Sequence, residues 1–224
     1  MEDERTVLSL PYSNLTQIPA VKEDIQCVIL YHNKITSINM TYLPNVHSLD
    51  LSDNQITTIQ NLENLPNLRV LDLGYNLLTQ IENLELLPLT DLFLMCNDIE
   101  KIDSLRILSL KNLDMACNSI AKIENLACVN LEELYLGNNR IRTVENIGHL
   151  SQLHTLSLQC NQIQTVDCRR LPKSLRYLLL DGNQELEEVV NLEYLDKLEY
   201  LDVSKTRIKE HDLRERGGLE IVLV

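Results

Sequence analysis

The stretch Leu68-Arg69-Val70-Leu71-Asp72-Leu73-Gly74-Tyr75-Asn76-Leu77-Leu78 decides the fold, because its pattern recurs in register through most of the 224-residue chain. Four further copies occupy Leu89–Ile99, Leu110–Ile120, Leu131–Ile141 and Leu153–Ile163. The asparagine returns every 21 or 22 residues, at Asn33, Asn54, Asn76, Asn97, Asn118, Asn139, Asn161 and Asn183. Ser13 and Thr206 stand in its place at either end. A fixed period of this length indicates a solenoid.

The spacing of leucines within each copy predicts which side chains face inward. Residues of a short strand alternate between interior and solvent, so the leucines at positions one, four and six should form the core. One repeat cannot bury that face alone, but stacked neighbours build a continuous core. The asparagine is expected to turn inward and bond the backbone of the bend, forming a polar ladder. The pattern resembles the leucine-rich repeat, L-x-x-L-x-L-x-x-N-x-L.

The expected fold class is therefore α/β: a leucine-rich-repeat solenoid with one curved parallel sheet of about eleven short strands. The repeats are too short for a full helix on the return side, so the convex side should consist of extended or 3₁₀ segments. We expect a single leucine-rich-repeat domain over residues 1–224, with repeats that start near residues 5, 25, 46, 68, 89, 110, 131, 153, 175, 198 and 219.

The two ends of the array carry further expectations. The first strand should lie near Val7 to Leu10, and we assign Leu219, Val222 and Val224 to positions one, four and six of the last repeat. The chain then stops on an apolar strand, which we expect either to be covered or to have lost a cap, because exposed strand edges promote association. The free protein is expected to be a monomer, with dimerisation through this edge as the alternative.

Composition narrows the classes of function. The net charge of −13 argues against nucleic acid and anionic membranes as partners, since both reward basic surfaces. The start of the chain, Met1 to Arg5, lacks the features of a signal peptide, and no stretch approaches the roughly 20 apolar residues of a membrane span. A location in the nucleus, the cytoplasm or both is therefore expected. The five histidines fall in unrelated repeat positions, and no phosphate-binding loop or nucleophile motif occurs, so we predict neither an enzyme nor a cofactor.

The six cysteines have no framework spacing. Cys96, Cys117 and Cys160 each stand directly before a repeat asparagine, and the first two belong to adjacent repeats. Neighbouring strands lie roughly 4.8 Å apart, which could bring these two thiols within reach of a disulfide or a metal. The favoured interpretation is a set of reduced thiols in a reducing compartment, because a metal site needs more converging ligands.

The outward residues of the sheet are the ones that the repeat leaves free. The middle residue of each L-x-L reads Ser9, Ile29, Asp50, Asp72, Phe93, Asp114, Tyr135, Ser157, Leu179, Asp202 and Leu223. Phe93 is the only phenylalanine and falls on a solvent-facing position, while Asp50 and Asp72 should be neighbours that repel. The second set of outward positions adds Asp91, Glu133, Tyr177 and Tyr200.

These outward residues predict a protein-binding surface. Acid and aromatic residues alternate from Asp72 to Tyr135, and aromatic anchors commonly carry the binding energy of an interface while charges select the partner. The acids would select a basic partner surface. The alternative interpretation of each acid is a solvated surface residue.

Several segments resemble the leucine-rich-repeat regulatory subunit of protein phosphatase type 1, the regulatory subunit 7 family. The resemblance covers roughly Val46 to Lys209 and includes Ile-Glu-Asn-Leu after the repeat asparagine, at Ile81 to Leu84 and Ile123 to Leu126. The segments Val70 to Leu78 and Asn138 to Arg142 are also similar to that family.

The resemblance implies a non-catalytic scaffold that grips the phosphatase catalytic subunit with its concave face. Matched by position, the implied contacts are Asp72, Phe93, Asp114, Tyr135 (where the family has Phe) and Asp202. The family continues with a Glu and a Trp, which we place at Ile221 and Leu223, and with a final repeat and cap that this sequence lacks.

Two other classes of protein share the repeat. An adaptor of another assembly, similar to the dynein-light-chain or spliceosomal members of the superfamily, would use a helical spur or a basic tail, which we do not find. A surface-attachment protein of the internalin kind would need a signal sequence and an anchor, which we also do not find.

Overall fold

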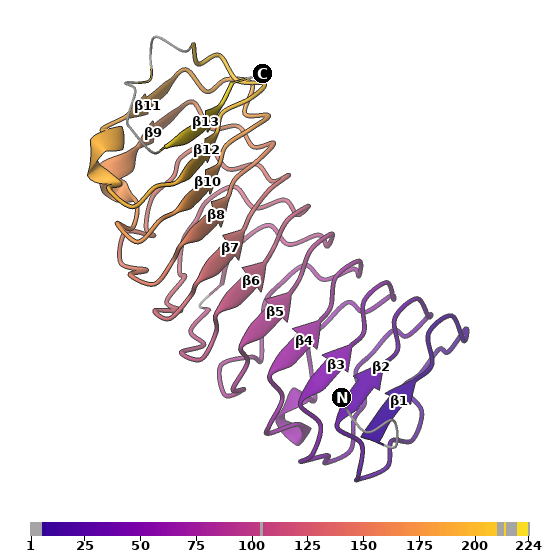
Figure 1. Cartoon of the computed structure of the whole chain (residues 1–224). Coiled ribbons are helices and arrows are strands. Elements are labelled where there is room, and N and C mark those ends of the chain that lie inside the picture. Colours follow the sequence, from indigo (N-terminus) through magenta and orange to yellow (C-terminus); the bar gives the residue numbers. More distant parts are fainter. Residues whose placement is uncertain (1–5, 104, 210–212, 214–218, 224) are drawn as a thin grey trace.

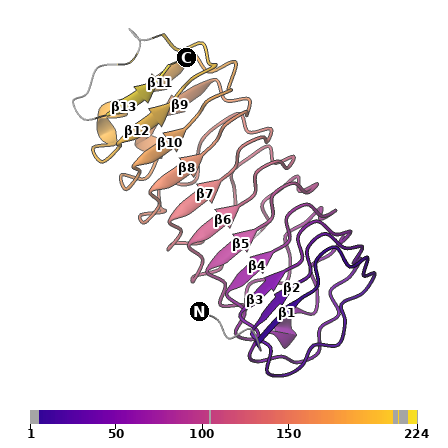
Figure 2. The same ribbon diagram turned by 45° about the vertical axis from the view of Figure 1, so that its right-hand side comes forward.

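One parallel sheet runs the length of the array. The computed structural model describes residues 6–103, 105–209, 213 and 219–223. Within them, an eleven-stranded sheet follows chain order, except that β9 and β11 pair elsewhere (Figures 1 and 2). Its strands are β1 (Val7–Ser9), β2 (Cys27–Ile29), β3 (Ser48–Asp50), β4 (Val70–Asp72), β5 (Asp91–Phe93), β6 (Asn112–Asp114), β7 (Glu133–Tyr135), β8 (Thr155–Ser157), β10 (Tyr177–Leu179), β12 (Tyr200–Asp202) and β13 (Glu220–Val222). The expected solenoid with about eleven strands is confirmed.

The core is aliphatic and continuous, as the leucine spacing predicts. The middle residue of most strands is fully buried, including Leu71, Leu92, Leu113 and Leu134 at 0% exposure. The first and third residues of each strand point to the opposite side, which we call the sheet face. No helix in the described part of the chain is long and apolar enough to cross a membrane.

The repeat asparagines form the predicted ladder. The Nδ2 of Asn76 donates to the carbonyls of Leu51, Leu73 and Gly74 at 3.0–3.1 Å, and its Oδ1 accepts the Ile56 N–H at 2.9 Å. The same bonds recur at the other positions, except that the Asn183 Nδ2 donates to two carbonyls instead of three. Each asparagine thus ties its own bend to the repeat before it. The residues that replace asparagine at the two ends of the array make fewer of these hydrogen bonds. The Thr206 hydroxyl, for example, donates to the Val203 carbonyl at 2.6 Å.

A second, unexpected asparagine ladder runs along the convex side. Five asparagines adopt left-handed backbone with φ of 55–62°, at Asn61, Asn83, Asn125, Asn146 and Asn191. Four of them donate through Nδ2 to an isoleucine carbonyl of the preceding repeat, as Asn83 does to Ile59 at 2.6 Å. The Ile-Glu-Asn-Leu segments are therefore also a structural device that links neighbouring turns.

The convex side is built from extended chain and 3₁₀ turns, as expected. The 3₁₀ turns are η2 (Leu62–Asn64), η3 (Cys168–Arg170) and η4 (Leu192–Tyr194). Near the C-terminal end, β9 (Thr165–Asp167) and β11 (Glu188–Val190) pair in parallel as a separate two-stranded sheet. That small sheet was not predicted, because β9 and β11 lie outside the L-x-L pattern that marks the strands of the main sheet.

The residue before each repeat asparagine also adopts left-handed backbone. We call this column the bend column; its φ values run from 51° to 73°, at Tyr12, His32, Asp53, Tyr75, Cys96, Cys117, Asn138, Cys160, Gly182 and Lys205. Left-handed backbone is uncommon outside glycine. The column keeps this backbone even at Tyr12 and Lys205, which precede Ser13 and Thr206. Side chains of neighbouring repeats meet along it, as the Tyr12 and His32 rings do at 4.3 Å between centroids.

The assignment of the last strand was wrong by one residue. Leu201 pairs with Ile221 and Asp202 pairs with Val222, so Leu219, Ile221 and Leu223 pack against the core. We expected Val222 in the core and Ile221 and Leu223 on the outward positions. A one-residue slip moves every side chain of a strand to the other face, and the observed pairing places Glu220 beside Tyr200 on the sheet face. Val224 lies outside the described residues.

Candidate functional site

An acid–aromatic stripe crosses the sheet face from β3 to β7. Successive strand pairings place Asp50 beside Asp72, Asp72 beside Phe93, Phe93 beside Asp114, and Asp114 beside Tyr135. All five side chains are half-buried. We call these five residues the acid–aromatic stripe. They form one uninterrupted row in the order of the strands, so five of the nine predicted binding residues lie together.

The aspartates of the stripe also close the bends that follow their strands. One carboxylate oxygen of Asp72 accepts the Gly74 N–H at 2.9 Å, and Asp114 accepts the Ala116 N–H at the same distance. For both residues, the second oxygen has no hydrogen-bond partner among the described residues. The bend bond fixes each side chain, and the second oxygen is left available to a partner.

Burial and like charge raise the pKa of Asp72 to about 6. Desolvation is the largest cause, and the neighbouring Asp50 and Asp114 carboxylates add to it against the opposing Gly74 bond. Desolvation also raises the pKa of Asp114. At neutral pH the stripe therefore holds ionised carboxylates in a partly buried environment that disfavours their charge. A cation from a partner would offset this electrostatic cost.

The aromatic residues of the stripe lie against the sheet. Tyr135 donates its hydroxyl to Glu133 at 2.7 Å, and burial together with that carboxylate raises the Tyr135 pKa to about 12. The predicted binding residue Glu133 thus orients the Tyr135 ring. Phe93 is less exposed than its outward position implies, because it lies between two neighbouring strands.

The remaining predicted residues form a second group further along the sheet face. Tyr177 pairs with Tyr200 on adjacent strands, and Asp202 lies beside Tyr200. Ser157 and Leu179 separate this group from Tyr135 in the outward column. Asp202 is therefore three strands from the acid–aromatic stripe, and the structure makes two groups rather than one.

The tyrosines of the second group have charged neighbours. The Arg176 guanidinium binds Glu199 through two bonds of 2.8 and 2.9 Å and lies 5.7 Å from the Tyr177 ring centroid. Tyr177 is 38% exposed and also approaches Glu199 at 3.4 Å. These contacts hold Tyr177 at the margin of the sheet face.

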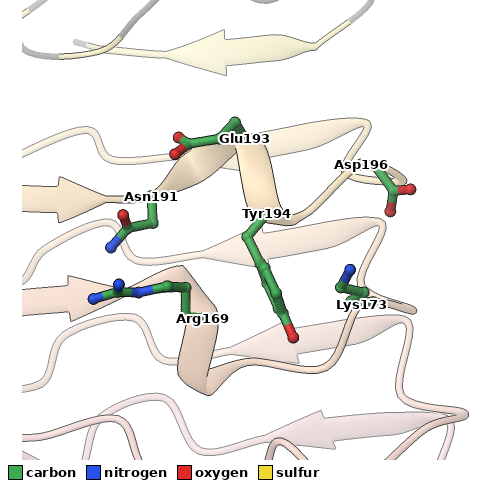
Figure 3. A pocket seen from close by; sticks show the side chains of 6 residues that line it. All are labelled: Arg169, Lys173, Asn191, Glu193, Tyr194 and Asp196. Atoms are coloured by element: carbon green, nitrogen blue, oxygen red, sulfur yellow. The ribbon is translucent and has the colours of Figure 1, made fainter.

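A hollow of about 330 Å³ lies on the convex side between η3 and η4 (Figure 3). Its basic residues already have partners: Arg169 forms a two-bond ion pair with Asp167 at 3.1 and 2.9 Å, and the Lys173 ammonium lies 4.4 Å from the Tyr194 ring centroid. Acidic residues line the rest of the hollow, namely Glu193 and Asp196. Because the hollow is lined by charges of both signs and its basic residues are already paired, we assign no ligand to it.

The cysteines are unlinked. All six are free thiols, and no group of three or more His, Cys, Asp or Glu side chains suited to a metal ion occurs in the described ranges. Cys128 and Cys168 are buried, and burial raises their thiol pKa values. Cys96, Cys117 and Cys160 lie in the bend column, with Cys117 and Cys160 exposed.

Comparison with known proteins places the repeat in a family. The pattern described as Leucine Rich repeats (2 copies) matches residues 44–86 and 129–169, two separate parts of the same continuous sheet. This chain is a leucine-rich repeat protein. A search of curated proteins finds no match to it.

Solved structures share the architecture of this leucine-rich repeat protein. YopM from Yersinia enterocolitica WA-314 has 23% identity and a TM-score of 0.73, over 87% of this chain and 41% of that one. A chain of the octameric complex of Latrophilin 3, Unc5D and FLRT2 (LRR) has 25% identity and a TM-score of 0.68, over 88% and 73%. The internalin InlF from Listeria monocytogenes has 21% identity and a TM-score of 0.55, over 98% and 82%. The chain thus spans less than half of the YopM chain.

Replacing Asp72 with asparagine should stabilise the free leucine-rich repeat protein in a pH-dependent way. Asparagine retains the oxygen that accepts the Gly74 N–H but carries no charge. A carboxyl with a raised folded pKa contributes its stability below the unfolded pKa and loses it as pH rises through the folded value. The variant should therefore be about 1–3 kcal/mol more stable than wild type at pH 8, after allowance for partial exposure, and the gain should vanish near pH 4.

Urea denaturation at pH 4, 6 and 8 measures this difference. Asp98→Asn is the matched control, because Asp98 is exposed and carries the same charge. A gain at Asp72 that is equal at pH 4 and pH 8 would show that the carboxylate is not destabilising.

Proposed function

We propose that this leucine-rich repeat protein is a non-catalytic regulatory subunit that binds the catalytic subunit of a type 1 serine/threonine protein phosphatase through its sheet face. The repeat fold is suited to protein–protein interaction; a related repeat domain, FLRT2, is a component of an octameric protein complex. The proposed place of action is the nucleus, the cytoplasm or both.

The observation that carries the proposal is the register of the acid–aromatic stripe. The series that the resemblance implies, Asp72, Phe93, Asp114 and Tyr135, occupies four successive strands of one outward column. Nothing in the repeat itself requires an aromatic there, since the core takes its aliphatic residues from the other face. These four side chains are thus not needed for the core, and their continuous row could contact a single partner.

The chemistry of the row defines the partner surface that fits it. Phe93 and Tyr135 would fill apolar depressions, while Asp72 and Asp114 would pair with lysine or arginine. A fixed carboxylate with one free oxygen loses little side-chain entropy on pairing, and a cation would reverse the unfavourable desolvation at Asp72. Asp202 with Tyr177 and Tyr200 would form a second contact further along the face.

The observed register of the last strand bears on the C-terminal part of the proposed site. The family positions for Glu and Trp, expected at Ile221 and Leu223, correspond to Glu220 and Val222 when the strands are aligned as paired. The acidic residue is therefore retained, and it is exposed beside Tyr200. The aromatic residue is replaced by a valine.

Binding of the purified chain to a purified type 1 phosphatase catalytic subunit tests the proposal directly. Complex formation at micromolar affinity or tighter is the expected result. Association should slow several-fold between about 50 and 500 mM salt, with a smaller change in dissociation, because the acids mainly steer the encounter. Stopped-flow or surface-plasmon measurements separate the two rates.

Two outcomes would contradict the proposal. The first is an absence of binding at concentrations of about 100 μM. The second is recovery of motor or splicing components, and of no phosphatase, when the chain is purified with its partners from the native cell, which would favour the adaptor alternative.

A further inference from the structure

We propose that Cys96 and Cys117 form a redox-active dithiol, a site where a low-molecular-weight disulfide oxidises the two thiols to a reversible disulfide between neighbouring repeats. The site is separate from the proposed phosphatase contacts and does not depend on them.

The backbone places the two cysteines side by side. They follow Phe93 and Asp114, a directly paired couple on β5 and β6, by three residues each. The two bends remain locked in step beyond the strands, since Cys96 N–H donates to the Ala116 carbonyl at 2.9 Å and Cys117 N–H to the Gly137 carbonyl at 2.8 Å. Adjacent chains of a sheet are roughly 4.8 Å apart, within the Cα separation of about 4.4–6.8 Å that disulfides span.

The side chains of the bend column touch along the stack. Cys96 and Cys117 both have left-handed backbone, with φ of 53° and 55°, so their side chains leave the bend in the same direction. The Cys96 thiol is among the groups that raise the Cys117 pKa, so the two side chains are electrostatic neighbours. An independent measure of the spacing comes from the next cysteine, because a Cβ added at Gly182 would lie 2.7 Å from the Cys160 sulfur. Side chains of neighbouring repeats in this column can therefore come close enough to touch.

Access and neighbours give the two thiols distinct roles. Cys117 is exposed and Cys96 is partly covered, so Cys117 is the sulfur that an external disulfide meets first. Burial and the Cys96 thiol raise the Cys117 pKa, so attack by its thiolate should accelerate toward alkaline pH. Cys160, in the same column, has Asn138 and Gly182 as its column neighbours and no second thiol.

The reaction balances as an exchange. The Cys117 thiolate attacks one sulfur of a disulfide RSSR, which forms a mixed disulfide and releases one thiolate RS⁻. Cys96 then loses its proton to solvent and attacks the Cys117 sulfur, which releases the second RS⁻. Two cysteine thiols are oxidised and one RSSR is reduced to two thiols.

Glutathione disulfide applied to the fully reduced chain tests the site, with tryptic mass mapping under non-reducing conditions. Trypsin separates the two cysteines, because Lys101, Arg106 and Lys111 lie between them. Each of the resulting peptides, 70–101 and 112–122, contains a single cysteine. The expected product is these two peptides joined, short of two hydrogens and restored by dithiothreitol.

Variants distinguish a dithiol from two independent thiols. In Cys96→Ser, a glutathione adduct should persist on Cys117 at about tenfold or higher occupancy than in wild type, because no neighbouring thiol displaces it. Cys160 supplies the internal control and should retain its adduct in both proteins. Stable adducts on Cys96 and Cys117 in the wild-type chain, without the joined peptides, would overturn the proposal.

Discussion

Phe93→Ala is expected to weaken binding of the phosphatase catalytic subunit by about 30-fold or more, which corresponds to about 2 kcal/mol. Phe93 is the central residue of the acid–aromatic stripe, with a carboxylate on the strand at either side. An aromatic side chain flanked by charges buries the largest apolar area at the middle of such an interface, where water is most completely excluded. Titration calorimetry against the purified catalytic subunit measures the change.

Two matched variants show whether the loss is specific to the ring and to the sheet face. Tyr135→Phe keeps the ring and removes the hydroxyl that donates to Glu133, so affinity should change by no more than about threefold. Leu86→Ala removes a side chain that is 96% exposed in the turn before β5, and should leave binding unchanged. If Leu86→Ala weakens binding as much as Phe93→Ala does, the partner does not bind at the stripe.

Asn139→Ala is expected to destabilise the fold by about 3 kcal/mol. The Asn139 side chain is 7% exposed, and its Nδ2 donates to the carbonyls of Met115, Leu136 and Gly137 at 3.0–3.2 Å. Its Oδ1 accepts the Ile120 N–H at 2.9 Å, which would be left buried without an acceptor. Urea denaturation monitored by circular dichroism gives the free energy of unfolding.

A second variant and a control locate the source of that loss. Asn139→Asp keeps an acceptor for Ile120 but cannot donate to three carbonyls, and should destabilise the protein at least as much. Asn130→Ala removes an exposed asparagine that makes one 2.8 Å bond to the Leu108 carbonyl, and should cost less than about 1 kcal/mol. Equal losses at Asn139 and Asn130 would mean that the ladder contributes nothing special to stability.

The stripe could be predicted because the repeat has a strict register. Once Leu71 and Leu92 are assigned inward, Asp72 and Phe93 must point outward, and parallel stacking at a nearly constant period must make them neighbours. The same reasoning predicted the contact between Asp50 and Asp72, which the structure confirms. The alternation of acidic and aromatic residues at these outward positions then indicated a binding surface.

Other features of the stripe had no signal in the repeat pattern. The bond from Gly74 N–H to Asp72 is local, yet it depends on the bend that follows the strand. The burial that raises the Asp72 pKa depends on the side chains of both neighbouring strands.

By itself, the sequence determined the solenoid, its core and the direction of side chains from β1 to β12, because leucine and asparagine recur with one period and each copy needs the next to bury its face. The tertiary structure decided what depends on contacts between repeats: the convex asparagine ladder, the left-handed backbone of the bend column, and the alignment of β13. At β13 the sequence offers a run of apolar residues, Ile221 to Val224, from which either register would turn two side chains inward. Pairing with β12 decides which ones face the core.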